Sequence, residues 1–372
     1  MTIGYSEQTL AANGFRGIAN YRIPALAVAP NGDLLCAFDE RPLHGDSPAP
    51  NSIVQRRSTD GGLTWGEVTD IHRGDVTGDP ATQTGYSDPS YIVDQEAGLI
   101  FNFHVYSKDR GVFDSGYGSD DADRSIISAE VSVSADDGRT WEHRLITDVV
   151  KTPDCRAVFA TSGAGIQVRR GRYAGRLVQQ YVGVFRAPGG TGAEDDPVHV
   201  SAFSVFSDDH GATWTAGAPV GTAMDENKVV ELSDGTLMMN SRMHDCEGGR
   251  WICRSSDGGA TWTEPVADMS LTDPGNNAHI VRAHPDAEPG TAESRVLLFS
   301  NADHAPQERR NGTVRISFDD GATWPVSRVF QPGDCSYSVI IPTGEDRYAL
   351  AYEGVDNEIR VATIESRWLF AD

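Results

Sequence analysis

The residues most conspicuously arranged for chemistry are five aspartates in a recurring octet, S-x-D-x-G-x-T-W. The octet begins at Ser58, Ser134, Ser207, Ser255 and Ser317. Closely spaced aspartate and glycine are typical of calcium loops, but the octet lacks the remaining ligand positions and the bidentate glutamate of such a loop. Its serine and aspartate side chains can instead satisfy nearby backbone N–H groups, and its fifth-position glycine can adopt a positive φ. The pattern therefore predicts a structural turn, anchored by its tryptophan.

No other generic catalytic or cofactor motif accompanies the octets. The ten histidines show no metal-ligand spacing, and the chain has neither a phosphate-binding loop nor a G-x-S-x-G motif. Five cysteines are too few and too scattered for a disulfide framework or a zinc pattern. Cys246 and Cys253 flank an expected hairpin and could pair across it, although buried free thiols are the favoured interpretation. The sequence therefore predicts no cofactor and no metal.

The octets also indicate the fold, because each one can mark a turn within a blade of β-strands. Apolar runs are short, and 39 glycines and 19 prolines imply frequent turns. A four-stranded propeller blade takes about 40–50 residues, so each interval between octets can hold one blade with inserts. Strand-like segments before residue 36 and from Tyr337 to Glu365 could form a sixth blade from both chain ends. The prediction is a single all-β domain over residues 1–372, a six-bladed β-propeller.

A family resemblance emerges when the octets are combined with YRIPAL at Tyr21–Leu26. The chain resembles the bacterial exo-α-sialidases, or neuraminidases, from about residue 15 to residue 365, with YRIP where the family has its FRIP motif. YRIP alone is weakly specific, whereas YRIP with five octets is strongly specific. The resemblance implies a six-bladed propeller that removes terminal sialic acid, with retention, from oligosaccharides, glycoproteins or glycolipids.

The resemblance implies three arginines that bind the carboxylate of sialic acid. They correspond to Arg22 in YRIP, Arg242 in MMNSR and Arg309 in ERRNGTVR. Several guanidiniums can hold such an anion with charge-assisted hydrogen bonds in fixed directions. Arg310, next to Arg309, is the alternative for the third position.

Tyr337 in CSYSVII resembles the family's tyrosine nucleophile. Sialidases are an exception among retaining glycosidases, which otherwise use a carboxylate, and a neutral phenol avoids repulsion by the substrate's own carboxylate. A phenol with an ordinary pKa of about 10 needs a partner that takes its proton. Glu226 in MDENKVVELSDG matches that partner, and Glu231 is the less favoured alternative because it lies in the apolar run VVEL.

Asp46 fits the general acid that protonates the leaving oxygen and later activates water. It lies in HGDSPAP, a segment rich in glycine, proline and serine and therefore expected to form a surface loop. Asp39 is the weaker alternative because it ends an apolar run.

Three further assignments follow from the resemblance. Arg41 and Asp88, the latter in GYSDPSY, look like the pair that holds the 4-hydroxyl side of the sugar. Glu353 in AYEG matches a glutamate that orients Arg22.

Two segments have looser expectations. A pocket for the N-acyl group of the sugar could include Asn276 or Asn277 in DPGNNAH, between which the sequence does not decide. The acidic, glycine-rich insert 108–124 predicts a mobile surface loop in preference to an element that gates substrate.

Charge and hydropathy exclude several partners. Fifty-four acidic against 31 basic side chains give a net charge of -23, which disfavours nucleic acid and anionic membranes. Screening limits this repulsion to about 8 Å, so a local arginine cluster can still bind an anion. No run reaches the roughly 18 apolar residues of a membrane helix, so membrane insertion is not expected. The N-terminal residues lack signal-peptide features, and secretion of a chain whose signal is absent here is slightly favoured over a cytoplasmic location.

Three functions compete with hydrolysis of ordinary sialosides. A trans-sialidase, or a hydrolase of deaminated sialic acid, would share the same motifs. A propeller lectin that binds sialic acid without cleaving it belongs to another class. The lectin is disfavoured because candidates for nucleophile, base and acid are all present in Tyr337, Glu226 and Asp46.

Overall fold

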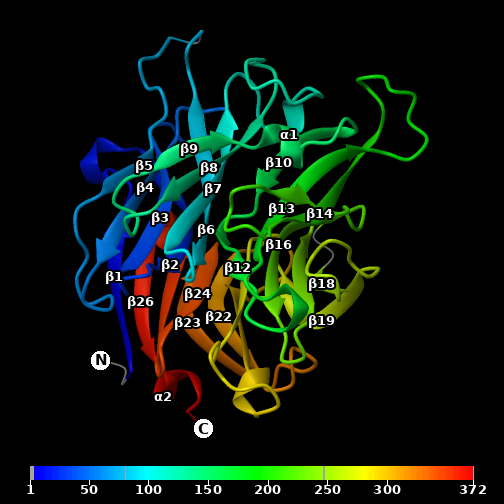
Figure 1. Ribbon diagram of the computed structural model, residues 1–372. Coiled ribbons are helices and arrows are strands. Elements are labelled where there is room, and N and C mark those ends of the chain that lie inside the picture. The colour runs from blue at the N-terminus through cyan, green and yellow to red at the C-terminus, as the bar shows by residue number, and fades with distance from the viewer. Residues whose placement is uncertain (1–3, 80, 246–247, 372) are drawn as a thin grey trace.

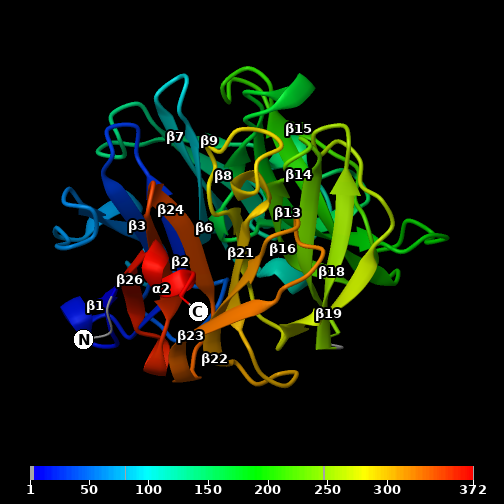
Figure 2. The ribbon, with the colours of Figure 1, turned by 90° about the horizontal axis from the view of Figure 1, so that it is seen from below.

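The computed structural model describes residues 4–79, 81–245 and 248–371. These residues form six sheets of four or five strands, arranged as the blades of a β-propeller (Figures 1 and 2). The predicted six-bladed fold is therefore confirmed.

Each blade consists of strands that follow one another along the chain, with two exceptions: the point of closure, and a short strand that joins blade 2 from within the segment that forms blade 3. Blade 1 contains β2 (Asn20–Val28), β3 (Leu34–Arg41), β4 (Ser52–Ser58) and β5 (Thr69–His72), and blade 2 contains β6 (Gly85–Asp94), β7 (Leu99–Ser107), β8 (Ser128–Ser134), β9 (Glu142–Leu145) and the short β11 (Gly163–Ala164). Blade 3 contains β10 (Cys155–Ala160), β12 (Ile166–Gln167), β13 (Leu177–Arg186), β14 (Val198–Ser207) and β15 (Thr215–Ala216). Blade 4 contains β16 (Met224–Glu231), β17 (Leu237–Met243), β18 (Gly248–Ser255) and β19 (Val266–Asp273), and blade 5 contains β20 (His279–Arg282), β21 (Leu297–Ala302), β22 (Arg310–Ser317) and β23 (Val326–Asp334). Blade 6 contains β24 (Ser338–Gly344), β25 (Arg347–Glu353), β26 (Ile359–Glu365) and β1 (Tyr5–Ala11).

Within the described residues, helical structure is limited to single turns that connect strands or follow the last strand. The α-helical turns are α1 (Thr147–Val150) and α2 (Ser366–Leu369), and the 3₁₀ turns are η1 (Phe15–Gly17), η2 (Val112–Asp114), η3 (Gly171–Tyr173), η4 (Glu293–Arg295) and η5 (Val355–Asn357). Among the described residues, no helix combines the length and the apolar character that crossing a membrane requires.

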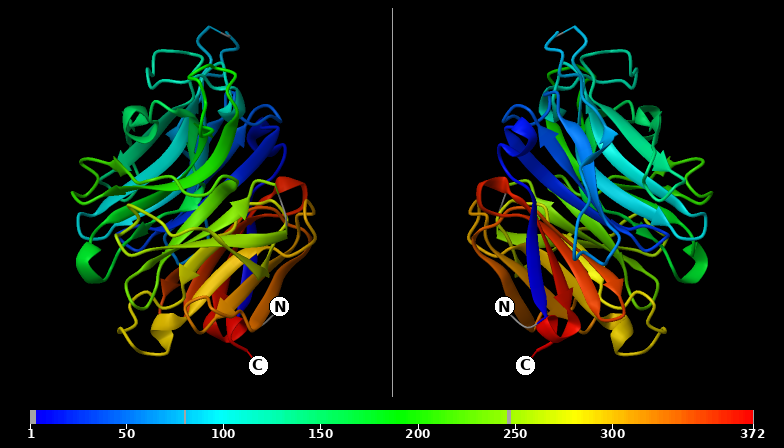
Figure 3. Two further views of the ribbon diagram at one scale, coloured as in Figure 1. Left: turned by 90° about the vertical axis from the view of Figure 1, so that its right-hand side faces the viewer. Right: turned by 90° about the vertical axis from the view of Figure 1, so that its left-hand side faces the viewer.

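The two ends of the chain close the propeller together. Strand β1 pairs antiparallel with β26, with Tyr5 opposite Ile364, so an N-terminal strand completes a blade of C-terminal strands. Figure 3 shows both termini at the same end of the molecule. The sequence-based expectation of a sixth blade formed from both ends is confirmed, and the closure leaves no gap between the first and last blades.

Each octet is a turn between the third and fourth strands of its blade. In the first octet, Ser58 Oγ accepts the N–H of Gly62 at 2.8 Å, and Asp60 accepts both the N–H of Thr64 at 2.9 Å and its hydroxyl at 2.6 Å. Gly62 has φ 90°, which suits glycine. The other four octets repeat these hydrogen bonds. The serine, aspartate and threonine side chains of each octet therefore bond within the turn, as the turn interpretation predicts.

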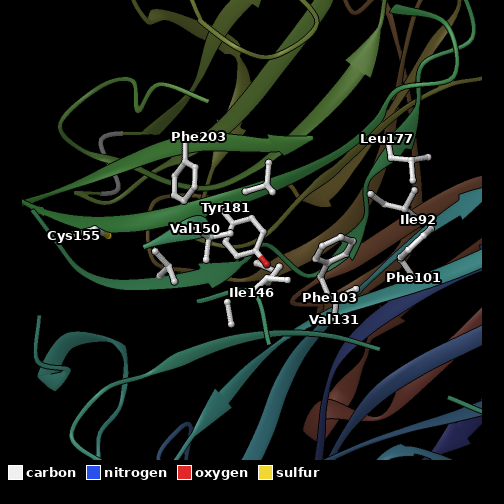
Figure 4. Close-up of a cluster of buried hydrophobic side chains, with 14 of the residues drawn as sticks. Ile92, Phe101, Phe103, Val131, Ile146, Val150, Cys155, Leu177, Tyr181 and Phe203 are labelled. Atoms are coloured by element: carbon white, nitrogen blue, oxygen red, sulfur yellow. The ribbon is translucent and has the colours of Figure 1, made fainter. Parts of the chain in front are cut away.

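The core lies between neighbouring blades. Strands such as β13 are buried along almost their whole length because each blade packs on both of its faces. In Figure 4, Phe101 and Phe103 of blade 2 lie near Tyr181 and Phe203 of blade 3. Trp214, from the octet of blade 3, meets Phe103 edge-on with ring centroids 4.9 Å apart. The tryptophans thus anchor each octet to the preceding blade.

The described cysteines are buried free thiols: Cys36, Cys155, Cys253 and Cys335. This agrees with the favoured interpretation for Cys253. Cys246, its possible partner, lies outside the described residues.

Candidate active site

A cavity of about 340 Å³ gathers eight of the nine residues that the resemblance singled out. Its lining includes Arg22, Arg41, Asp46, Asp88, Glu226, Arg242, Arg309 and Tyr337. The volume is within the range of small-ligand pockets. The ninth residue, Glu353, lies buried directly behind the lining.

Three innermost strands are irregular where they reach this cavity. The registers of β2, β6 and β16 shift over 22–25, 87–90 and 224–227, and each interval contains a lining residue. Ile23 has φ 62° and Asp88 has φ 64°, a conformation that is rare for residues other than glycine and most unusual for a β-branched side chain. Such irregularities redirect side chains at the edge of a sheet. They explain how strands buried along most of their length present polar groups to one cavity.

Three guanidiniums surround the ring of Tyr337. The Cζ atoms of Arg22 and Arg309 lie 5.4 and 5.3 Å from its centroid. Arg242 donates from Nη1 to Glu226 Oε2 at 2.8 Å, and that oxygen also contacts Tyr337. An anion held by the three arginines would therefore lie beside the phenol.

The choice between the adjacent Arg309 and Arg310 is decided by geometry. Arg309 lines the cavity, and its Nη2 donates to the carbonyl of Gly275 at 2.7 Å. Arg310 is the first residue of β22 and is exposed. Its Nε lies 3.6 Å from Asp334 Oδ1. Only Arg309 is placed to meet a ligand in the cavity.

Tyr337 and Glu226 form a buried hydrogen bond. The Tyr337 hydroxyl donates to Glu226 Oε2 at 2.7 Å, and Tyr337 is 8% exposed. Burial and the charge of Glu226 raise the pKa of Tyr337 well above its ordinary value, against the opposing effect of the surrounding arginines. The phenol is therefore neutral at rest and has a proton acceptor at hydrogen-bonding distance.

Glu231 has a different environment from Glu226. Its carboxylate accepts the backbone N–H groups of Arg169 at 3.0 Å and Arg170 at 2.8 Å. These contacts tie β16 to the neighbouring segment and lie away from the cavity.

Asp46 lies at the mouth of the cavity with 81% of its side chain exposed. Nη1 of Arg41 donates to its carboxylate. Partial desolvation opposes the shift, but the positive charges of Arg41, Arg22 and Arg309 hold the pKa of Asp46 below its usual range. An incoming anion that neutralises these arginines would raise that pKa.

Asp39 has a role that the sequence did not suggest. It is fully buried and accepts from Nε and Nη2 of Arg41 at 3.1 and 2.8 Å, and from the backbone N–H of Asp88 at 3.1 Å. Burial raises the pKa of Asp39 to about 6 despite Arg41, and burial together with Asp39 raises that of Asp88. Asp39 therefore orients the predicted pair for the sugar hydroxyl and does not compete with Asp46 for the mouth of the site.

Glu353 contacts both the Arg22–Ile23 segment and the backbone of Tyr337. Its Oε1 accepts from Arg22 Nε at 2.6 Å and from the N–H of Ile23 at 2.7 Å, while Oε2 lies 3.3 Å from the N–H of Tyr337. Burial opposes its ionisation, but Arg22 and these hydrogen bonds lower the pKa of Glu353.

Glu353→Gln is expected to lower kcat/KM for a sialoside by about 10–100-fold, because the amide leaves one charge-assisted contact unmade. The loss should lie chiefly in KM, since Arg22 would be misplaced while Tyr337 and Glu226 remain. Steady-state kinetics and thermal unfolding check this, with the more exposed Glu358→Gln as the matched control. A wild-type KM in a correctly folded Glu353→Gln variant would contradict a positioning role.

Much of the segment 108–124 is exposed, as expected of a surface loop, but part of it reaches the cavity. Val112 and Phe113 of η2 line the cavity. Lys108, which is buried, secures the segment by donating to Asp121 O at 3.0 Å and Ser128 Oγ at 2.9 Å.

The expected asparagines do not form the pocket for an N-acyl group. Asn276 Nδ2 donates to Ser336 O at 2.9 Å, and Asn277 donates to Ser162 while its Oδ1 accepts from Lys228 Nζ at 2.8 Å. Both asparagines are buried, and neither lines the cavity. An apolar wall of Val112, Phe113 and Phe159 lines the cavity instead.

A charged pair missed by the sequence stands beside this wall. His244 Nδ1 lies 3.0 Å from Asp225 Oδ2, and its ring centroid is 5.8 Å from that of Phe113. The hydrogen bond to Asp225 raises the pKa of His244, and despite burial the pKa of Asp225 is lowered. Both residues line the cavity, but neither stands in a motif that distinguishes it from an ordinary strand residue.

Comparison with known proteins shows what the chain is similar to. Residues 112–349 match the family model of the BNR repeat-like domain. A protein named sialidase from Micromonospora viridifaciens is 51% identical over 98% of the chain. The chain spans 54% of that relative, about half of its length.

Two solved structures extend the comparison. A Hadza microbial sialidase has a TM-score of 0.85 at 28% identity, covering 98% of this chain and 69% of that one. An intramolecular trans-sialidase from Ruminococcus gnavus, solved with oseltamivir carboxylate, has a TM-score of 0.77 at 18% identity, covering 95% and 96%. The latter similarity concerns the fold alone.

Proposed function

The chain belongs to the BNR repeat-like domain family and is a homologue of bacterial sialidases, and on this premise we propose that it is a retaining exo-α-sialidase. Its substrates would be oligosaccharides, glycoproteins or glycolipids that end in sialic acid. Residues 1–372 would act as one catalytic domain.

One observation carries the proposal. The hydrogen bond of 2.7 Å between Tyr337 and Glu226 lies among Arg22, Arg242 and Arg309. Three arginines suit a carboxylate, and a neutral phenol suits attack on a carbon that carries one. A lectin would need the arginines but has no need for a buried nucleophile and base.

The first chemical step would form a bond between Tyr337 Oη and the anomeric carbon. The glycosidic carbon–oxygen bond breaks, Glu226 takes the phenolic proton, and Asp46 gives its proton to the departing oxygen. In the second step Asp46 removes a proton from water, which attacks the anomeric carbon. Tyr337 then leaves and recovers its proton from Glu226, so the sugar is released with retained configuration.

Asp46→Asn is expected to lower kcat/KM for a sialoside with a sugar leaving group by about 10²–10⁴-fold. The effect on a substrate with an activated aryl leaving group should be much smaller, because that oxygen departs without protonation. Comparing kcat/KM isolates this first step from the later attack of water. Equal losses on both substrates would contradict the acid role.

The pH dependence of kcat/KM should reflect the protonation of Asp46. The reactive form of Asp46 is protonated, and its pKa in the free site is lowered by Arg41 despite partial desolvation. Its protonated fraction falls about tenfold for each pH unit above that pKa. We therefore expect kcat/KM for a natural sialoside to decline from about pH 5 to pH 8, and a rise over this interval would contradict the assignment.

Turnover of an α-linked sialoside with a fluorogenic aglycone tests the proposed function itself. NMR of the first product should show α-sialic acid, as retention requires. Accumulation of a sialylated acceptor would identify a trans-sialidase instead. Exclusive turnover of deaminated substrates would identify a hydrolase of deaminated sialic acid. Binding of sialosides without any turnover would overturn the proposal in favour of a lectin.

A further inference from the structure

A cluster of three histidines and one glutamate lies between blades 1 and 2. His72 ends β5 of blade 1, whereas His104, Glu130 and His143 come from β7, β8 and β9 of blade 2. The described lining of the candidate active site contains none of the four. The cluster is therefore separate from the residues of the proposed sialidase reaction.

Three imidazole nitrogens approach one carboxylate oxygen. Glu130 Oε1 lies 2.6 Å from His72 Nδ1, 2.9 Å from His104 Nε2 and 3.8 Å from His143 Nδ1. The candidate ligand atoms of His72, Glu130 and His143 all lie within 4.8 Å of one another. Imidazole nitrogen with a carboxylate oxygen is a donor set that suits zinc.

His104 directs one ring nitrogen toward a backbone carbonyl and the other toward Glu130. Its Nδ1 lies 3.0 Å from the backbone carbonyl of Asn102, which can only accept, so Nδ1 carries a proton. A metal-bound histidine typically has this arrangement, with the far N–H donated to a carbonyl.

The surroundings hold His104 and Glu130 in place and leave the side of His143 open. The ring of His72 stacks between Tyr86 and His143, with centroid distances of 3.7 Å to each. His104 and Glu130 are buried, whereas 33% of the His143 side chain is exposed. An ion can therefore reach buried donors past a histidine at the surface.

We propose that His72, His104, Glu130 and His143 bind a Zn²⁺ ion that links blade 1 to blade 2. Tetrahedral zinc with bonds of about 2.0–2.1 Å brings its ligand atoms to about 3.3 Å from one another. His143 must move inward to reach this geometry, exchanging its present contact with Ser132 Oγ at 2.8 Å for the ion. His72 and His104 already contact Glu130 Oε1 from their strands.

Isothermal titration of the metal-free chain, produced without a histidine tag, with ZnCl₂ tests this proposal. We expect one equivalent of Zn²⁺ to bind with a Kd below about 1 µM. Zinc at about 100 times Kd should raise the Tm by roughly 3 °C or more, because the ion binds only the folded arrangement. Co²⁺ in place of Zn²⁺ should give the visible absorption of a tetrahedral cobalt site.

Matched variants locate the site. His143→Gln is expected to weaken zinc binding by about 100-fold, and Glu130→Gln should do likewise because it removes the negative charge. His284→Gln, which removes a histidine elsewhere in the fold, should leave the titration unchanged. Sialoside turnover is measured separately, so failure of the zinc site and failure of the proposed function are distinguishable.

Two results would overturn the zinc site. One is the absence of zinc binding and of a zinc-dependent Tm shift in the folded wild-type chain. The other is zinc binding that survives in both His143→Gln and Glu130→Gln, or that is lost in His284→Gln. The first would mean that a proton alone occupies the centre of the cluster.

Discussion

Replacing Tyr337 with phenylalanine is expected to lower kcat for an α-sialoside by at least about 10³-fold. The variant lacks the oxygen that would bond to the anomeric carbon, while its ring still fills the space beside Arg22 and Arg309. The carboxylate clamp should therefore persist, and the loss should lie in kcat with KM or the Kd of a sialoside little changed. Steady-state kinetics measure kcat and KM, and direct titration with a sialoside measures its Kd.

A second buried tyrosine of blade 6 provides the control. Tyr352 also donates its hydroxyl to a glutamate, Glu7, at 2.6 Å, but it lies away from the cavity. Tyr352→Phe should keep the wild-type kcat and lose only stability. Wild-type turnover in Tyr337→Phe, or equal losses in the two variants, would remove Tyr337 from the mechanism.

Glu226→Gln is expected to lower kcat by about 10²–10⁴-fold. Burial and Glu226 keep the pKa of Tyr337 well above its ordinary value, so the phenol cannot attack unless its proton leaves as the bond forms. A glutamine can accept the hydrogen bond but cannot take the proton. Kinetics with an activated aryl sialoside measure this step, because its leaving group needs no acid.

Glu231→Gln is the matched control on the same strand. Its two backbone contacts predict a lower Tm, since the amide replaces one acceptor oxygen with a donor. Its kcat should stay near that of the wild type. If Glu226→Gln kept full kcat, or if Glu231→Gln lost as much, the base would have to be another residue.

The repeated octet made most of the fold predictable. A turn that satisfies its own polar groups, as Ser58, Asp60 and Thr64 do, depends on local sequence and so recurs wherever the octet recurs. Closure by the chain ends follows from counting strands, because a propeller that leaves one blade incomplete exposes an edge.

The grouping of distant residues in the site could be anticipated only through family motifs. What the sequence could not supply is the irregular backbone near Ile23 and Asp88, because a register shift depends on the partner strand. The contact of Asp39 with Arg41 could not be anticipated for a similar reason. Its burial beneath Arg41 is a property of neighbouring strands and not of its own segment.

The histidine cluster illustrates the same limit. His72, His104, Glu130 and His143 come from four strands in two blades, so their spacing along the chain resembles no metal motif. A short spacing predicts a metal site only where one loop or helix supplies the ligands. The expectation that the chain needs no metal rested on spacing alone.

The most direct measurement of the central claim is mass spectrometry of the trapped intermediate. A sialosyl fluoride with a second fluorine beside the anomeric carbon should react at that carbon and then hydrolyse slowly, because fluorine destabilises the oxocarbenium-like transition state. The protein should gain the mass of one fluorosialosyl group, and digestion should place it on the peptide bearing Tyr337, with no label in Tyr337→Phe. Label on a different residue, or hydrolysis of this probe with inverted configuration, would contradict the tyrosine mechanism.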